Sequence, residues 1–308
     1  MELRQFISRS VGLLAGVVFV AAVVGLSAGL EPFATWFYSF AWWSYIVMAD
    51  AVIFQRRRES LLMNRPLELP RLAAASVTCW LIFEFANFFL GNWHYQGLPE
   101  GRLGRWLGYW LGFATVLPGI FQTRDLVDAL DLVPRQRGRV YAVSENWPVL
   151  FILVGWLLWL LPLIWPRVFF PLVWLAPIFF LEPFCALGGG RSLWLAWCQG
   201  ERREVYLLLL AGLLCGILWE TWNFWAKAKW VYTLPYLQFG KVFEMPILGY
   251  LGFPPFAVAC AVMHNCLTML QQRWLSSSRA RQRWLLTQVL FWLGMFLALD
   301  YRTVWWCP

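Results

Sequence analysis

Charged residues are scarce in this chain. They make up 14% of its 308 residues, whereas 60% are hydrophobic and 23 are tryptophan. A soluble domain carries about 25% charged residues, so this composition excludes a soluble protein and predicts an integral membrane protein whose partners are membrane lipids. The net charge of +8 does not indicate nucleic-acid binding, because the basic residues form short clusters between apolar segments, where they anchor loops.

Metal-binding motifs and the motifs of soluble enzymes are also missing. The chain has 2 His and 7 Cys but no Cys-x-x-Cys pair, and the two histidines, His94 and His264, fall on different predicted faces of the membrane. A zinc site or a disulfide framework is therefore not expected. The sequence contains no Gly-x-Ser-x-Gly, P-loop or His-Glu-x-x-His. We predict no metal and no cofactor.

Long apolar runs dominate what is present. Crossing the hydrocarbon takes about 20 residues in a helix, which predicts an all-α integral membrane fold of about nine transmembrane helices. The first run is too long for a signal peptide and is predicted to be a retained span. The predicted spans are residues 11–28, 34–54, 72–91, 106–122, 149–165, 168–187, 205–225, 246–263 and 284–299.

The orientation follows from the basic residues, which resist translocation across the membrane. With the N-terminus inside, every inside loop carries Arg, and most of the 25 Lys and Arg residues lie on the inside. We therefore predict a protein of the cytoplasmic (inner) membrane with its N-terminus inside and its C-terminus outside.

One arrangement of parts occurs twice in the chain. Glu84 aligns with Glu220 and Asn87 with Asn223, and each copy continues into a Trp-x-Tyr segment and a returning helix with glycines. We predict two four-helix repeats in parallel orientation, because an even number of spans keeps the direction. The predicted domains are the repeats at residues 1–122 and 146–270, an amphipathic cytoplasmic linker at 123–145, and a polar break with a ninth helix at 271–308.

The repeated acids are the main candidates for chemistry. Glu84 and Asn87 lie about one turn apart on one helix face, as do Glu220 and Asn223. A carboxylate at this depth costs a few kcal/mol, so it should face the bundle interior and be protonated or hydrogen-bonded. Two interpretations remain open: a catalytic or proton-carrying pair, or a clamp between helices worth about 1 kcal/mol.

Other candidates surround these pairs. An aromatic belt at the membrane interface would explain most of the tryptophans, but two Trp-Tyr pairs recur at matched distances from the acids and are predicted to bind substrate. Two glycines interrupt the eighth helix, a typical pointer to a ligand site. Asp50, Glu182 and His264 are secondary candidates. The predicted substrate-binding residues are Trp93, Tyr95, Trp230, Tyr232, Gly249 and Gly252.

This order of parts resembles the repeated unit of the integral-membrane lycopene cyclase domain, over about 30 residues in each half. The resemblance implies that Glu84 and Glu220 match the acid of that unit's first helix, and that the ligand is isoprenoid. The chain departs from that family where it has paired glutamates: Leu248 and Gly249 stand in one half, Gly108 and Tyr109 in the other. The chain also resembles a bacterial polytopic membrane family with Glu-x-x-Asn and Met-Pro-Ile-Leu-Gly-Tyr signatures, for which no activity is implied.

Three functions remain open from the sequence. The first is a site for a long apolar, isoprenoid-like lipid, with a glutamic acid as proton donor in an isomerase-like or cyclase-like reaction. The second is a proton-coupled transporter or lipid flippase of the same architecture. The third is a membrane scaffold without catalytic activity, in which the acids only lock helices together.

Overall fold

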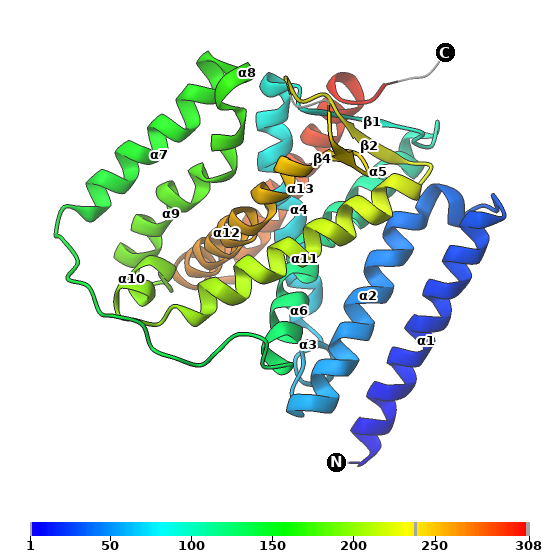
Figure 1. Cartoon of the computed structure of the whole chain (residues 1–308), viewed down its shortest axis with the longest axis horizontal. Helices are drawn as coiled ribbons and strands as arrows, with labels where there is room; N and C mark the ends of the chain where they lie inside the picture. Colours follow the sequence, from blue (N-terminus) through cyan, green and yellow to red (C-terminus); the bar gives the residue numbers. More distant parts are fainter. Residues whose placement is uncertain (1, 237–238, 306–308) are drawn as a thin grey trace.

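The computed structural model describes residues 2–236 and 239–305, so the last three residues of the predicted ninth-helix domain, including Cys307, lie outside the described residues. Figure 1 shows a bundle of helices with the first described residues and the C-terminal segment at opposite ends. The helices are α1 (Glu2–Ser27), α2 (Phe33–Arg57), α3 (Leu61–Asn64), α4 (Glu68–Leu90), α5 (Arg102–Phe113), α6 (Val116–Ala129), α7 (Trp147–Ile164), α8 (Pro166–Phe169), α9 (Ala176–Leu187), α10 (Leu193–Cys198), α11 (Arg203–Trp225), α12 (Phe253–Trp274) and α13 (Ser278–Arg302). Two 3-10 turns, η1 (Phe170–Trp174) and η2 (Ile247–Gly252), and four short strands, β1 (Trp93–Gln96), β2 (Lys229–Tyr232), β3 (Lys241–Val242) and β4 (Met245–Pro246), complete the described elements.

Eight helical segments of the described chain are long and apolar enough to cross a membrane. The flanking helices α1 and α7 are apolar even where nothing covers them: Leu13 is 73% exposed and Leu153 is 58% exposed. A helix that is apolar all round is stable when lipid surrounds it. The prediction of a helical membrane protein is therefore confirmed, with eight such segments in residues 2–236 and 239–305 where nine were expected.

The predicted fourth span, residues 106–122, is divided into two short helices. α5 has 12 residues and α6 has 14, and a single crossing needs about 20. The chain turns at Thr115, whose hydroxyl donates to the Gly112 carbonyl at 2.6 Å. Pro118 then lies in the first turn of α6, the part of a helix where a missing N–H is tolerated. The break follows from these local contacts, which a hydropathy average over a window of residues does not detect.

The first residues of the predicted linker, 123–129, belong to α6. α6 continues to Ala129, because its polar residues near that point are buried and bonded. The Thr123 hydroxyl lies 2.8 Å from the Tyr45 hydroxyl of α2 and accepts from the Cys215 thiol of α11 at 3.2 Å. These contacts hold α6 between two other helices, and the irregular connection starts only after it.

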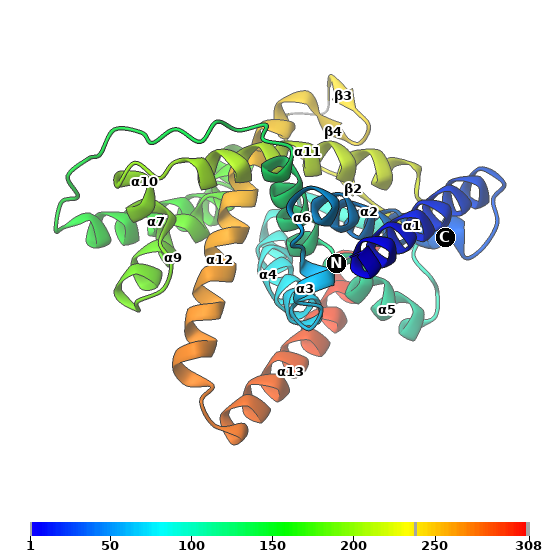
Figure 2. The same cartoon turned by 90° about the horizontal axis from the view of Figure 1, so that it is seen from below.

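The core lies where α2, α4, α6, α11 and α12 meet (Figure 1). α1 packs on α2 at one edge and α7 packs on α9 at the other. Figure 2 shows α12 and α13 joined as a V whose tip points away from the other helices. α13 returns to α4, where the Gln288 amide and the Trp292 indole donate to the Thr78 hydroxyl at 2.8 and 2.9 Å. We call α1 to α6 the N-terminal half and α7 to α12 the C-terminal half.

Candidate functional site

Glu84 lies near the end of α4, fully buried at 0% exposure. Its Oε1 atom accepts hydrogen bonds from the Trp80 indole at 2.9 Å, the Trp93 indole at 3.1 Å and the Tyr95 hydroxyl. Trp80 is four residues earlier on the helix, so it shares the face of the acid. The Oε2 atom has no partner among the described residues. Three donors on one oxygen therefore fix this carboxyl, while its second oxygen is buried and unbonded.

Glu220 occupies the matching place in α11 and is also 0% exposed. Its Oε1 atom accepts from the Tyr232 hydroxyl at 2.9 Å, and its Oε2 atom has no partner in the described part of the chain. Both acids are thus bonded to the tyrosine of their own Trp-x-Tyr segment. The predicted alternative of a Glu-to-Asn clamp across the two halves does not correspond to the observed contacts.

Asn87 and Asn223 bond the backbone that follows their helices. The Asn87 side chain donates to the Trp93 carbonyl at 2.8 Å and accepts from the Trp93 N–H at 3.2 Å. Asn223 makes the same pair of bonds with Trp230, at 2.8 and 2.9 Å. An amide side chain can donate to a carbonyl and accept from an N–H at once. Both asparagines therefore position the Trp-x-Tyr strands, and their predicted role in catalysis stays a prediction.

The turn after α4 depends on a glycine. Gly91 has φ of +60° and its N–H bonds the Asn87 carbonyl. Such a left-handed residue ends a helix and strains any residue with a side chain. The chain can then reverse within two residues and enter β1.

The two Trp-x-Tyr segments pair with each other. β1 and β2 are antiparallel, with Trp93 opposite Tyr232 and Tyr95 opposite Trp230. Burial and the neighbouring carboxyl raise the pKa of each tyrosine well above its ordinary value, so the hydroxyls stay protonated and donate. The pairing brings both tyrosines, and behind them both acids, to one place.

A cavity of about 160 Å³ lies between the halves, beside this strand pair. About half of the residues around it are aromatic and come from both halves, among them Trp80, Trp174 and Trp219. All six residues predicted to bind substrate line it: Trp93, Tyr95, Trp230, Tyr232, Gly249 and Gly252. Glu84, Asn87, Glu220 and Asn223 are not part of the lining. The aromatic side chains that donate to the two acids line the cavity instead.

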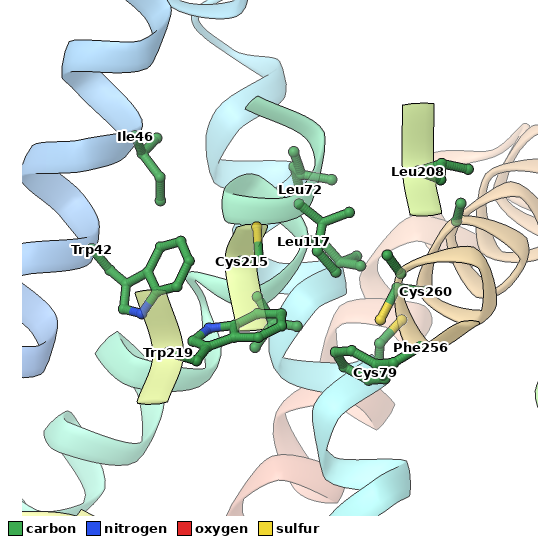
Figure 3. Close-up of a cluster of buried hydrophobic side chains, with 14 of the residues drawn as sticks. Trp42, Ile46, Leu72, Cys79, Leu117, Leu208, Cys215, Trp219, Phe256 and Cys260 are labelled. Atoms are coloured by element: carbon green, nitrogen blue, oxygen red, sulfur yellow. The ribbon is translucent and has the colours of Figure 1, made fainter. Parts of the chain in front are cut away.

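Two tryptophans cross between the halves in reciprocal fashion. Trp42 of α2 packs on Trp219, the residue before Glu220, with ring centroids 5.4 Å apart. Trp174 of η1 stacks on Phe83, the residue before Glu84, at 5.0 Å. Figure 3 shows Trp42 and Trp219 side by side, with Phe256 further along the same cluster. Each half therefore buries the acid helix of the other.

The secondary candidates lie away from the cavity lining. Asp50 accepts from the Ser60 hydroxyl at 2.7 Å, and Glu182 accepts from the Ser192 hydroxyl at 2.5 Å. Each serine also caps a short helix that follows it. Asp50 and Glu182 therefore hold the serine-capped turns that follow α2 and α9. His264 lies within α12, where its ring packs on Phe121 at 5.1 Å.

Three residues near the site were not among the predicted site residues, and only one of them, Trp80, has a signal in the sequence. Trp80 was visible as a Trp four residues before Glu84, a spacing that places both on one helix face. Arg105 and Asp300 gave no such signal, because 195 positions separate them. Their ion pair, 2.7 Å long, ties α13 to α5. Tyr109 also bonds Asp300, at 3.0 Å.

No cluster of three or more His, Cys, Asp and Glu that would hold a metal ion occurs among the described residues. What the arrangement offers is an apolar aromatic cavity with two carboxyl–tyrosine pairs at its wall. Arg105 and Lys229 also line it, each paired with an acid, so such a cavity suits an uncharged organic group. Comparison of the chain with models of protein families, with curated proteins and with solved structures finds no match.

Proposed function

We propose that this protein binds a long apolar lipid of isoprenoid type within the membrane, and that its two carboxyl–tyrosine pairs transfer protons to and from that lipid. One observation carries the proposal. Tyr95 and Tyr232 both line the cavity between the halves, and each hydroxyl is bonded to a buried acid. Proton transfer needs such a donor within hydrogen-bond reach of a proton reservoir.

The aromatic lining supports a reaction through a carbocation. One carboxyl must start protonated: a carbon–carbon double bond takes the hydroxyl proton of its tyrosine while that carboxyl supplies the replacement, so the pair ends as a carboxylate and a neutral tyrosine, and a cation forms on the lipid. The faces of Trp and Tyr rings attract a cation within about 6 Å of the ring centroid. Loss of a proton from an adjacent carbon to the other carboxyl–tyrosine pair returns a neutral product. The second pair must start as a carboxylate to take that proton. The net change is an isomerisation; a ring closes when a second double bond of the lipid attacks the cation before the proton is lost. Neither reaction needs an oxidant or a reductant.

The architecture supports a repeat origin for this site. The acid, the asparagine, the serine cap and the crossing tryptophan make corresponding contacts in both halves. We propose two parallel repeats with a pseudo-two-fold axis along the membrane normal. The basic loops favour an N-terminus inside and a C-terminus outside the inner membrane. The resemblance to the lycopene cyclase domain agrees with an isoprenoid ligand.

A transporter for the same lipid is the second candidate, favoured by the place of the cavity. It lies at the interface of the two halves, where rocking of one half against the other would expose it alternately to each side. In that case the acids take up and release protons during the cycle instead of reacting with the lipid.

Gly252 allows a direct test of binding. It lines the cavity, and a Cβ placed on it meets nothing within 4 Å. Its φ of −77° accepts any side chain, so Gly252→Leu should fill space without disturbing the fold. Gly294 of α13 is also next to open space but lies away from the cavity, so Gly294→Leu is the control. Mass spectrometry of copurified lipids should show an apolar lipid with the wild type and the control, and at least tenfold less with Gly252→Leu.

The acids are tested by Glu84→Gln and Glu220→Gln. Both variants should keep the bound lipid, and both should stop its conversion when purified protein is incubated with the copurified lipid class. Loss of uptake driven by a pH gradient in proteoliposomes, with no conversion in the wild type, would replace the enzyme by the transporter. A lowered melting temperature as the sole effect would leave the acids with a structural role and contradict both functions.

A further inference from the structure

A second cavity of about 120 Å³ adjoins the first. Trp93, Trp174, Tyr232, Met245 and the two glycines of η2 line both cavities. The two cavities come together at Gly252, which has no atoms within 4 Å of its Cβ position, whereas the Met245 side chain fills the space beside Gly249. A long ligand in the aromatic cavity therefore has a place for one end in the smaller one.

Asn92 is the polar residue that distinguishes this smaller cavity. Its side chain lines the cavity and is 2% exposed, and neither Nδ2 nor Oδ1 has a hydrogen-bond partner among the described residues. Its backbone is held on both sides: the N–H donates to Asn87 at 2.8 Å and the carbonyl accepts from Thr233 at 2.8 Å. A buried amide with no partner costs stability, and such groups are rare without a functional reason.

The chemistry of the cavity narrows what this amide can bind. No charged side chain lines it within residues 2–236 and 239–305, so a phosphate or an ammonium group would be buried without a counter-charge, which is costly. The amide offers a donor group, Nδ2, and an acceptor group, Oδ1, side by side. A hydroxyl group matches it, because it accepts from Nδ2 and donates to Oδ1. A pure hydrocarbon leaves both atoms unbonded.

We infer that Asn92 recognises the hydroxyl head of the lipid, so that the ligand is a long-chain isoprenoid alcohol and neither its phosphate ester nor a hydrocarbon. This inference rests on the proposed lipid-binding function and adds the ligand class to it. Tyr232 lines the smaller cavity and Tyr95 does not. The head group therefore lies beside the Glu220 pair, and the chain extends toward the Glu84 pair.

The test compares three probes on purified protein in detergent: geranylgeraniol, geranylgeranyl phosphate and the hydrocarbon of the same skeleton. Binding is followed by native mass spectrometry. The wild type should bind the alcohol at least tenfold more tightly than either of the others. Asn92→Leu removes both polar atoms at nearly constant volume, so it should abolish this preference and leave hydrocarbon binding unchanged.

Stability gives a second readout that separates recognition from a structural role. Because the Asn92 amide is unbonded within the protein, Asn92→Leu should keep or raise the melting temperature of the ligand-free protein. A clear drop in melting temperature would overturn the inference, as would equal affinity of the wild type for alcohol and hydrocarbon.

Gly252→Leu separates the proposed lipid site from the proposed role of Asn92. If it abolishes binding of all probes while Asn92→Leu leaves the preference for the alcohol intact, the lipid site stands and the role of Asn92 is refuted. If Gly252→Leu changes binding of no probe, the cavity is not the lipid site, and the inference is refuted together with the proposed function.

Discussion

The two acids sit at the same place on their helices, yet their surroundings differ. Among the described residues, Glu84 accepts three hydrogen bonds on Oε1, whereas Glu220 accepts one of comparable geometry, from Tyr232. The tyrosine bond is common to both. The first difference arises four residues earlier, where the N-terminal half has Trp80 and the C-terminal half has Gly216. Two indoles therefore separate the acids: that of Trp80, where the C-terminal half has Gly216, and that of Trp93, whose counterpart Trp230 has no hydrogen-bond partner for its indole N–H among the described residues.

The glycine in the C-terminal half is required by its neighbour. A Cβ on Gly216 would meet the Phe253 ring at 2.2 Å, so the aromatic ring occupies the space that an indole fills in the other half. Trp219 packs on the same ring, with centroids 5.8 Å apart. Both halves thus fill the volume beside the acid with aromatic carbon, but the N-terminal half does so with a side chain that also donates to the carboxyl.

A second difference lies on the outer surface of the halves. α13 covers the N-terminal half through the Arg105–Asp300 ion pair, and residues after α13 bond β1 at Tyr95, with N···O distances of 2.7 and 2.8 Å. Preceding the Trp-x-Tyr segments, the N-terminal half has the unbonded Asn92 amide and the C-terminal half has Lys229, paired with Glu244 at 2.9 Å. The halves share a scaffold for holding an acid, and they differ in what covers it.

Trp80→Ala is expected to have the largest effect of the variants that probe this comparison. It removes the indole donor to Glu84 and empties space between α4 and the rings of Phe83, Trp93 and Phe256. Trp80 is partly buried, so its truncation should cost about 3 kcal/mol, the lower end of the range for aromatic residues in a core. The melting temperature in detergent, followed by tryptophan fluorescence, should fall by several degrees.

Trp80→Phe is the matched control that separates the loss of packing from the loss of the hydrogen bond to Glu84. It keeps a six-membered aromatic ring but removes the N–H together with the rest of the five-membered ring, so the loss should be about 1–2 kcal/mol, a hydrogen bond plus a small cavity, and smaller than for Trp80→Ala. Equal melting temperatures for Trp80→Ala and the wild type would show that the difference between the acids has no energetic consequence.

Removal of the tyrosine hydroxyls tests whether the number of hydrogen bonds to each acid sets its contribution to stability. Tyr232→Phe takes away the one hydrogen bond to Glu220, and leaving a buried group unpaired costs about 1–3 kcal/mol. Tyr95→Phe leaves Glu84 with two indole donors, so its cost should be smaller, near 1 kcal/mol. Thermal unfolding of the two variants under the same conditions checks the order. A larger loss of stability for Tyr95→Phe would mean that Glu220 is held by contacts other than the Tyr232 hydroxyl.

The sequence allowed the class of fold and the aromatic part of the site to be predicted. Runs of apolar residues give helices of membrane length by composition alone, and the spacing of the Trp-Tyr pairs from the acids identified residues that do line the cavity. The roles of Asn87 and Asn223 were not predictable from spacing. An amide one turn from an acid can face a ligand or bond the strand that follows, and the choice depends on where the chain returns.

Contacts between distant segments were outside the reach of the sequence. Trp42 reaches Trp219, and Arg105 reaches Asp300, by tertiary packing that no periodicity records. The division of the fourth span at Thr115 has a local signal in Pro118, but a hydropathy window averages over it. The position of the aromatic side chains that bond the acids and line the cavity could not be predicted either, because it depends on how β1 and β2 pair.

The smallest expected effect concerns a third carboxyl that, unlike the buried pair, lies at the surface. Glu31, between α1 and α2, accepts from the Thr35 hydroxyl at 2.8 Å and pairs with Lys227 of the C-terminal half at 3.0 Å. The Thr35 hydrogen bond and then Lys227 hold the pKa of Glu31 below its ordinary value of 4.5. Because the folded-state pKa is lowered, this contribution to stability is complete above about pH 4.5 and is lost as the pH falls through the folded-state pKa. An exposed pair contributes at most about 1 kcal/mol, so Glu31→Gln should lower the melting temperature slightly at pH 7, and the two proteins should converge near pH 3. A difference that persists unchanged at low pH would assign the effect to the Thr35 contact or to the loop backbone, and the carboxylate would then have no part in joining the two halves.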